Sequence, residues 1–243
     1  MQTITILIPV YNNASTIEYL CNSIQSTINN YPNFCVQLLL ADDASTDGSF
    51  DKMIALKEKY DNISLLQLAY NHTQQYAFLA AIHYVKTDYL IYISADLQEE
   101  SAIIEKYLNV LKTDDRTDLY VGFREENKDF LIFRILSRLF YMLVRLKVPN
   151  MPENGFDTGC VKQSILQKFI KEFKKKDLVQ AVLVNCAPSV KQIPYTRQKS
   201  SSDKIKIKSL IFKIKYFVLS LISVYSKNKN TDKIYFSVKK YIP

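Results

Sequence analysis

The chain has 243 residues and a formal net charge of +8, from 32 Lys and Arg against 24 Asp and Glu. This length can bury a sizeable core, and a hydrophobic content of 48% argues against disorder. Four glycines are too few for a collagen-like, low-complexity or glycine-rich phosphate-loop protein.

The charge is unevenly distributed along the chain. Residues 1–121 contain 7 basic and 15 acidic side chains, and residues 122–243 contain 25 and 9. An acidic first half and a basic second half indicate different partners for the two halves. A basic half suits nucleic acid, an anionic membrane surface or a phosphorylated substrate. No nucleic-acid-binding motif accompanies the charge, so we do not expect nucleic acid as a partner.

In the first half, apolar runs rich in β-branched residues alternate with segments of helical periodicity. The runs predict strands at 4–10, 36–40, 63–68, 89–93 and 119–121. The segments between them predict helices at 15–28, 50–60, 74–85 and 99–111. This alternation predicts an α/β fold, with a mostly parallel sheet covered by helices on both faces.

Polar residues follow three of the predicted strands, at 9–13, 41–49 and 94–100. Ligands bind at the carboxyl ends of strands in such sheets, so these residues are candidates for a binding site. Carboxylates placed together repel one another unless they accept hydrogen bonds from a base or ribose, or coordinate a divalent cation. We expect Asp42 to bind ligand in this way. Asp47 directly precedes Gly48 and a predicted helix, so we expect it to cap that helix instead.

The second half is organised differently. Residues 130–147 carry apolar side chains at helical spacing and align Arg134, Arg138 and Arg145 on one face. A helix is predicted at 164–173 and a strand at 190–194, while 177–187 fits either a strand or a helix.

A further apolar helix is predicted at 209–226. Its uncharged part, 216–226, would span only about 16 Å against a bilayer core of about 30 Å, so it cannot cross a membrane. Five lysines precede this part between residues 204 and 215. The segment therefore fits an amphipathic helix lying on an anionic membrane, or an ordinary core helix with a basic flank.

The cysteines and the N-terminal segment indicate the compartment. Cys21, Cys35, Cys160 and Cys186 form no CxxC pair, so we expect free buried thiols and no structural zinc. Residues 1–13 lack a basic region before their short apolar run, which favours a first strand over a signal peptide. These features predict a cytoplasmic protein.

The motifs, in their order, resemble family 2 glycosyltransferases of the GT-A fold. IPVYNN (8–13), ADDASTDGS (41–49) and SADLQEE (94–100) carry this resemblance. Residues 71–81 resemble the NxGxxxAxxxG stretch of the polyprenyl-phosphate branch, which includes dolichol-phosphate mannosyltransferase and bactoprenol glucosyltransferases. GFR (122–124), FDTG (156–159) and Arg197 with Ser201, Ser202 and Lys204 extend the resemblance, which covers about residues 3–226.

The resemblance implies a Rossmann-like GT-A domain with a basic helical C-terminal region. Residues 1–121 are expected to form its nucleotide-sugar-binding half, and residues 122–202 its acceptor-binding half. Residues 203–243 are expected to form a basic amphipathic segment suited to a membrane surface.

The resemblance also implies roles for individual residues. The nucleotide sugar is expected to contact Pro9, Tyr11, Asn12, Asp42, Asp43, Asn71, Gln75, Ser94, Ala95 and Asp96. Mg²⁺ or Mn²⁺ is expected at Asp96 and Gln98. The catalytic residues are expected to be Asp157, Arg124 and Arg197, and the acceptor phosphate is expected to contact Arg134, Arg138 and Lys204.

The sequence departs from the family pattern at three places. Ser94 stands where the DxD-type motif commonly has Asp, which leaves Asp96 as its only carboxylate and should weaken metal binding. Thr73 and Ala81 replace two family glycines. The absence of Trp excludes the QxxRW signature of processive synthases, such as cellulose or hyaluronan synthase.

These features predict an inverting glycosyltransferase of bacterial surface-polysaccharide assembly, peripheral at the inner face of the cell membrane. It would move a hexose from a nucleotide sugar to polyprenyl phosphate. The favoured donor is UDP-hexose, and GDP-mannose is the alternative donor. One alternative acceptor is a sugar hydroxyl of a lipid-linked glycan, for which Asp157 would serve as base. A phosphate acceptor needs positioning cations rather than a base. A catalytically weak nucleotide-sugar-binding protein is a further alternative, suggested by Ser94.

Overall fold

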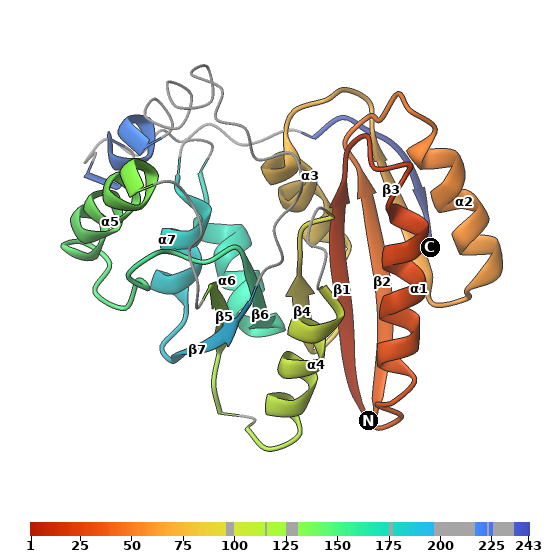
Figure 1. Ribbon diagram of the computed structural model, residues 1–243, viewed down its shortest axis with the longest axis horizontal. Helices are drawn as coiled ribbons and strands as arrows, with labels where there is room; N and C mark the ends of the chain where they lie inside the picture. The colour runs from red at the N-terminus through yellow and green to blue at the C-terminus, as the bar shows by residue number, and fades with distance from the viewer. Residues whose placement is uncertain are drawn as a thin grey trace.

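The computed structural model describes residues 1–95, 100–114, 116–124, 131–174, 177–196, 217–222, 224–225 and 236–243. In these residues, one eight-stranded sheet has the order β7-β5-β6-β4-β1-β2-β3-β8 (Figure 1). The strands are β1 (Gln2–Val10), β2 (Phe34–Asp42), β3 (Ile63–Leu68), β4 (Tyr89–Tyr92), β5 (Leu119–Arg124), β6 (Thr158–Lys162), β7 (Val190–Tyr195) and β8 (Val238–Ile242).

The strand directions bring most strand ends to one edge of the sheet. Strands β1 to β4 run parallel, and β5 runs parallel to β7. Strand β6 lies antiparallel between β4 and β5, and β8 pairs antiparallel with β3. The carboxyl ends of β1 to β5 and β7 therefore meet the amino ends of β6 and β8. We call this the carboxyl edge.

Helices cover both faces of the sheet, as the alternating pattern predicts. They are α1 (Ile17–Ile28), α2 (Ser49–Lys59), α3 (Gln74–Ala81), the 3₁₀ turn η1 (Ile82–Tyr84), α4 (Glu100–Leu111), α5 (Leu131–Arg145), α6 (Gln163–Glu172) and α7 (Val179–Cys186). Ile4, Ile6 and Ile8 of β1 pack in one core with α1, α2 and α4. Leu7 packs in the other core, with α3, α5, α6 and α7. Both faces of β1 are buried, which explains its uninterrupted apolar sequence.

Several predicted elements need correction or completion. Residues 177–187, ambiguous in sequence, contain helix α7. The prediction missed β8 entirely. All four cysteines are free, as expected, but Cys35 is exposed because side chains alternate at the start of β2 and Phe34 takes the inward position.

The C-terminal region is described only in part. Residues 217–222 and 224–225, inside the predicted helix 209–226, are largely helical. No helix in the described ranges is long and apolar enough to cross a membrane.

Candidate functional site

A pocket of about 340 Å³ opens at the carboxyl edge, between the ends of β1, β2 and β3 and the start of α3. We call it the edge pocket. It is lined by Pro9, Val10, Tyr11, Asn13, Asp43, Asn71, Thr73 and Gln74. Four residues expected to contact the nucleotide sugar are among them, although they come from three separate segments of the chain.

Asp43 is the carboxylate of the edge pocket. It is almost fully buried, and its two oxygens accept the backbone N–H groups of His72 and Thr73, each at 2.9 Å. Burial raises the pKa of Asp43, and these two N–H donors oppose the rise. The carboxylate is therefore fixed in the pocket wall, where it can accept a hydrogen bond from a ligand hydroxyl or N–H group.

Asp42 is buried at the end of β2 and does not line the edge pocket. Its carboxylate accepts the Ser45 N–H at 3.2 Å and the Gln67 side-chain amide at 3.1 Å. Consecutive side chains of a strand point to opposite faces, and Asp42 is the last residue of β2. Of the two predicted carboxylates, the structure places only Asp43 in the pocket.

Asn12 and Asp47 hold the loops around the pocket. Asn12 donates its backbone N–H to Ser45 Oγ at 3.0 Å, and its side-chain oxygen accepts the Thr46 N–H at 2.9 Å. Asn13 lines the pocket in its place. Asp47 accepts the N–H of Ser49, the first residue of α2, at 3.0 Å, so it satisfies a free N–H group at the helix start, as predicted, although the N-cap residue itself is Gly48.

Thr73 has a backbone conformation that normally requires glycine. Its φ of 144° and ψ of 159° lie in a region that L-residues rarely adopt, at a cost of about 1–3 kcal/mol. This is one of the positions where the resembling family has glycine. The conformation aims the Thr73 N–H at Asp43, so backbone strain accompanies the geometry of the pocket wall.

The start of α3 contacts the segment that follows β4. Gln74 lines the edge pocket and donates its side-chain amide to Ser94 Oγ at 2.8 Å. The predicted residue, Gln75, is half-buried and does not line the pocket, because successive helical residues are rotated by about 100°. Ala95, also predicted, is buried and follows the end of β4 by three residues.

The predicted metal ligands, Asp96 and Gln98, lie outside the described residues. Within the described ranges, no three His, Cys, Asp or Glu side chains come together in a group that could hold a metal ion. The expected Mg²⁺ or Mn²⁺ site therefore stays a prediction from the sequence.

On the other side of β4, strand pairing brings two predicted catalytic positions to the carboxyl edge. Asp157 is exposed and directly precedes β6, which pairs with β4 so that Gly159 lies opposite Tyr92. Arg124 ends β5 and pairs with Tyr195 of β7. Arg197 lies outside the described residues.

Tyr195 was not among the site residues predicted from the sequence, although it follows a predicted strand. Tyr195 is buried, and its hydroxyl donates to Asp157 Oδ2 at 3.3 Å. A tyrosine at the end of a strand that reaches the site edge is the signal that could have identified it. The Asp157 carboxylate is thus contacted from a neighbouring element while it remains open to solvent.

Gly159 allows β4 and β6 to pack closely below this carboxylate. A Cβ atom at Gly159 would lie 2.8 Å from the Tyr92 ring. The Thr158 hydroxyl also donates to the Tyr92 carbonyl at 2.6 Å. The FDTG motif therefore has a packing role beside any chemical role of its Asp157.

The predicted phosphate-binding arginines lie on a different element. Arg134 and Arg138 are exposed on α5 and line neither the edge pocket nor the second hollow described next. Lys204 lies outside the described residues.

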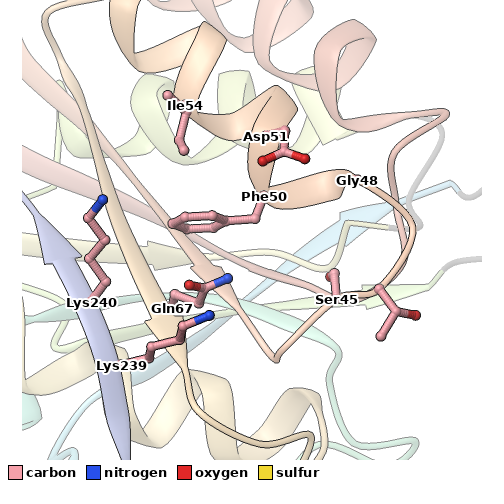
Figure 2. A pocket seen from close by; sticks show the side chains of 9 residues that line it. Ser45, Gly48, Phe50, Asp51, Ile54, Gln67, Lys239 and Lys240 are labelled. Atoms are coloured by element: carbon pink, nitrogen blue, oxygen red, sulfur yellow. The ribbon is translucent and has the colours of Figure 1, made fainter.

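A second hollow, of about 490 Å³, adjoins the β2–α2 loop (Figure 2). Figure 2 shows Gln67, Lys239 and Lys240 on neighbouring strands, across from side chains of α2. The Gln67 amide connects this hollow to Asp42. None of the predicted site residues lines it.

Comparisons with known proteins identify the family and the fold. Residues 5–170 match the family model described as glycosyl transferase family 2. Undecaprenyl-phosphate 4-deoxy-4-formamido-L-arabinose transferase from Salmonella choleraesuis is 27% identical over 147 residues, which are 60% of this chain and 44% of that protein. The protein of the same name from Salmonella newport matches over the same shares. The chain thus spans less than half the length of these curated relatives.

Two solved structures share the fold. Glucosyl-3-phosphoglycerate synthase from Mycobacterium tuberculosis, in complex with Mn²⁺, UDP and glucosyl-3-phosphoglycerate, has a TM-score of 0.67 and 14% identity over 92% of this chain and 80% of that one. Mannosyl-3-phosphoglycerate synthase from Rubrobacter xylanophilus has a TM-score of 0.61 and 14% identity over 90% and 73%. The predicted GT-A architecture, a mostly parallel sheet flanked by helices, is confirmed.

Proposed function

The chain belongs to glycosyl transferase family 2, and on this premise we propose that it is an inverting transferase that moves a hexose from a nucleotide sugar to polyprenyl phosphate. UDP-hexose is the favoured donor, and GDP-mannose is the alternative. The setting is bacterial surface-polysaccharide assembly, with the protein peripheral at the inner face of the membrane.

The observation that carries this proposal is the strand order at the carboxyl edge. Strand β4 lies between β1, which borders the edge pocket, and β6, which Asp157 precedes. A nucleoside in the edge pocket would direct its diphosphate and sugar toward the end of β4. The acceptor would approach from the side of Asp157 and Arg124. The UDP in the similar solved structure and the undecaprenyl phosphate in the relatives' name support the choice of donor and acceptor.

The reaction forms a bond between an acceptor oxygen and the anomeric carbon, and breaks the bond from that carbon to the diphosphate. A phosphate acceptor is already ionised, so no base is required, and cations must position it. We assign positioning to Arg124, Arg197, Arg134, Arg138 and Lys204. A divalent cation at Asp96 and Gln98 would neutralise charge on the departing diphosphate.

Transfer to a sugar hydroxyl is the second candidate, and the exposure of Asp157 favours it. This acceptor loses a proton as it attacks, and the Asp157 carboxylate would take that proton. The contact from Tyr195 at 3.3 Å would hold the carboxylate in place for this role.

Parallel transfer assays test both acceptors. UDP-glucose and GDP-mannose, labelled in the sugar, are incubated with undecaprenyl phosphate or with a lipid-linked glycan, with and without Mn²⁺. We expect a labelled prenyl-phosphate sugar, which Asp96→Ala should abolish. Asp157→Asn should reduce transfer to a hydroxyl by at least about 100-fold and transfer to phosphate much less. A product formed only with the glycan would replace the first candidate by the second.

A catalytically weak nucleotide-sugar-binding protein is the third candidate. It rests on Ser94, whose hydroxyl accepts the Gln74 amide where a carboxylate is common in the family. Calorimetric titration with the same donors separates it from the enzymes, because it predicts donor binding without turnover on any acceptor.

A further inference from the structure

Helix α5 has two opposite apolar faces. Phe140 and Val144 are buried in the core. The opposite face is exposed, with Ile135, Leu139 and Met142 at intervals of four and three residues, and Leu146, four residues further on and just past the end of the helix, is exposed as well. A helix with apolar side chains on opposite sides is normally covered on both sides. The outer face of α5 is exposed, so no described residue covers it.

The C-terminal helical segment packs along α5. The Phe217 ring stacks on Phe140 with centroids 4.5 Å apart and planes 14° apart. The Tyr225 hydroxyl donates to the Leu143 carbonyl at 2.7 Å. Figure 1 shows the segment, in blue, beside the green helix α5 at the end of the molecule opposite α2. Its exposed apolar residues are Val218, Leu219, Ile222 and Tyr225.

We call these eight side chains the two-helix face. They are eight of the thirteen large apolar side chains exposed within the described ranges. Apart from Met1, the other four are tyrosines, whose hydroxyl groups suit water. The exposed aliphatic side chains are therefore concentrated on two helical segments that pack against each other, which indicates an interaction site, because single exposed apolar side chains are normally scattered.

The charges beside the two-helix face are basic apart from Glu153, whose carboxylate lies 3.5 Å from the Arg145 guanidinium. Arg134, Arg138 and Arg145 lie along one flank of α5, at spacings of four and seven residues. Lys147 places its ammonium group 5.4 Å from the centre of the Tyr225 ring. Neither α5 nor the described part of the C-terminal segment contains an acidic residue, and Lys213 and Lys215 precede that segment in the chain. Apolar side chains bordered by cations complement a bilayer with anionic headgroups.

We propose that the two-helix face is a membrane-docking surface, which inserts its aliphatic side chains at the headgroup boundary of an anionic bilayer. Helix α5 has 15 residues and would extend about 22 Å, so it lies along the surface rather than across it. It begins shortly after Arg124, at the acceptor side of the carboxyl edge. The link to the acceptor lipid rests on the proposed function, and docking would hold the acceptor side near the lipid phosphates.

Vesicle binding by the full chain tests the surface. We expect it to sediment with vesicles of phosphatidylglycerol and phosphatidylcholine, less with phosphatidylcholine alone, and less as salt rises. Leu139→Glu combined with Ile222→Glu should reduce the bound fraction at least about tenfold, because both charges would enter the apolar layer. Tyr19→Glu, at an exposed position on α1, is the matched control and should bind like the unaltered chain. Unchanged melting temperatures would show that all variants fold.

Two results would overturn the inference. One is undiminished vesicle binding by the double variant. The other is self-association of the unaltered chain that Leu139→Glu abolishes, without vesicle binding, which would make the face a contact between two copies of this chain. Sedimentation velocity measures this association.

A soluble acceptor separates this inference from the proposed function. The double variant should lose transfer to undecaprenyl phosphate in vesicles, yet keep transfer to a short-chain, water-soluble prenyl phosphate. If the unaltered chain transfers to neither acceptor but still binds anionic vesicles, the proposed function fails and the docking surface is supported. If the double variant and the unaltered chain transfer equally well to undecaprenyl phosphate in vesicles, the docking surface is refuted and the proposed function is supported.

Discussion

The two sides of the carboxyl edge are held in different ways. On the side of β1 to β3, the buried Asp43 receives two backbone N–H bonds of 2.9 Å, and Asn12 is fixed to the next loop by two more hydrogen bonds. On the side of β5 to β7, the exposed Asp157 receives a longer bond of 3.3 Å from Tyr195. The first side is a preformed pocket, and the second is open to solvent.

This difference fits two kinds of ligand. A nucleotide is small and has a fixed pattern of donors and acceptors, so a rigid wall can bind it without reorganisation. A lipid-linked acceptor is long and arrives from a surface, which suits an open approach. Substitutions on the side of β1 to β3 should therefore change the affinity for the nucleotide. Substitutions on the side of β5 to β7 should change the choice of acceptor.

The largest effect is expected from Asp43→Ala. It leaves the N–H groups of His72 and Thr73 without their carboxylate partner and removes the acceptor of the edge pocket. We expect UDP affinity to fall by about 100-fold and the free energy of unfolding by about 1–3 kcal/mol. Calorimetric titration and urea unfolding measure the two. Asp51→Ala, at the exposed start of α2, is the control, and equal losses in both variants would contradict a specific role for Asp43.

On the open side, Tyr195→Phe should have a smaller and selective effect. It removes the hydroxyl that contacts Asp157 and keeps the buried ring. We infer a positioning role, so transfer to a sugar hydroxyl should fall about three- to tenfold, and the pH profile of kcat/KM should shift. Transfer to polyprenyl phosphate should stay unchanged. A loss that is equal for both acceptors would indicate a structural role only.

Thr73→Gly tests the strain in the rigid wall. Glycine adopts the observed φ of 144° without steric cost, although it also gains freedom in the unfolded chain. We expect a net stabilisation of about 1 kcal/mol, seen as a rise of about 2–4 °C in the melting temperature. Thr27→Gly, inside α1, should instead destabilise the protein, by about 0.3–0.5 kcal/mol from helix propensity alone. A melting temperature of Thr73→Gly below that of the unaltered chain would contradict the inference that Thr73 is strained.

The smallest effects concern pH. Burial raises the pKa of Asp43, so its contribution to stability is present at low pH and declines as the pH rises through the raised pKa. The Thr3 N–H and hydroxyl lower the pKa of Asp88, so its contribution is present at neutral pH and is lost as the pH falls. Asp43→Asn should reduce the dependence of the free energy of unfolding on pH above about pH 4. Asp88→Asn should reduce that dependence below about pH 4. Urea unfolding across this range measures both, and an unchanged profile in either variant would contradict the corresponding shift.

Much of the fold and the position of the site could be predicted from the sequence. Parallel strands need apolar residues on both faces, and that pattern located β1 to β5 and the polar segments that follow them. The sequence could not distinguish Asp42 from Asp43. A shift of one residue in the end of β2 would exchange the two carboxylates, and the sequence does not fix that end to a single residue. It also showed that α5 is apolar, but packing against Phe217 and the core determines which side chains stay exposed.

Strand β8 was beyond prediction because its five residues, VKKYI, are stabilised by pairing with a distant strand. That pairing also has a consequence for synthesis. Roughly 170 residues separate Leu68 from Val238, which a ribosome takes about 10–30 s to translate at 5–20 residues per second. During that interval the outer edge of β3 has no partner, and an unpaired strand edge recruits edges of other chains. Nascent chains on one messenger are therefore most prone to aggregate after β3 has emerged and before β8 has.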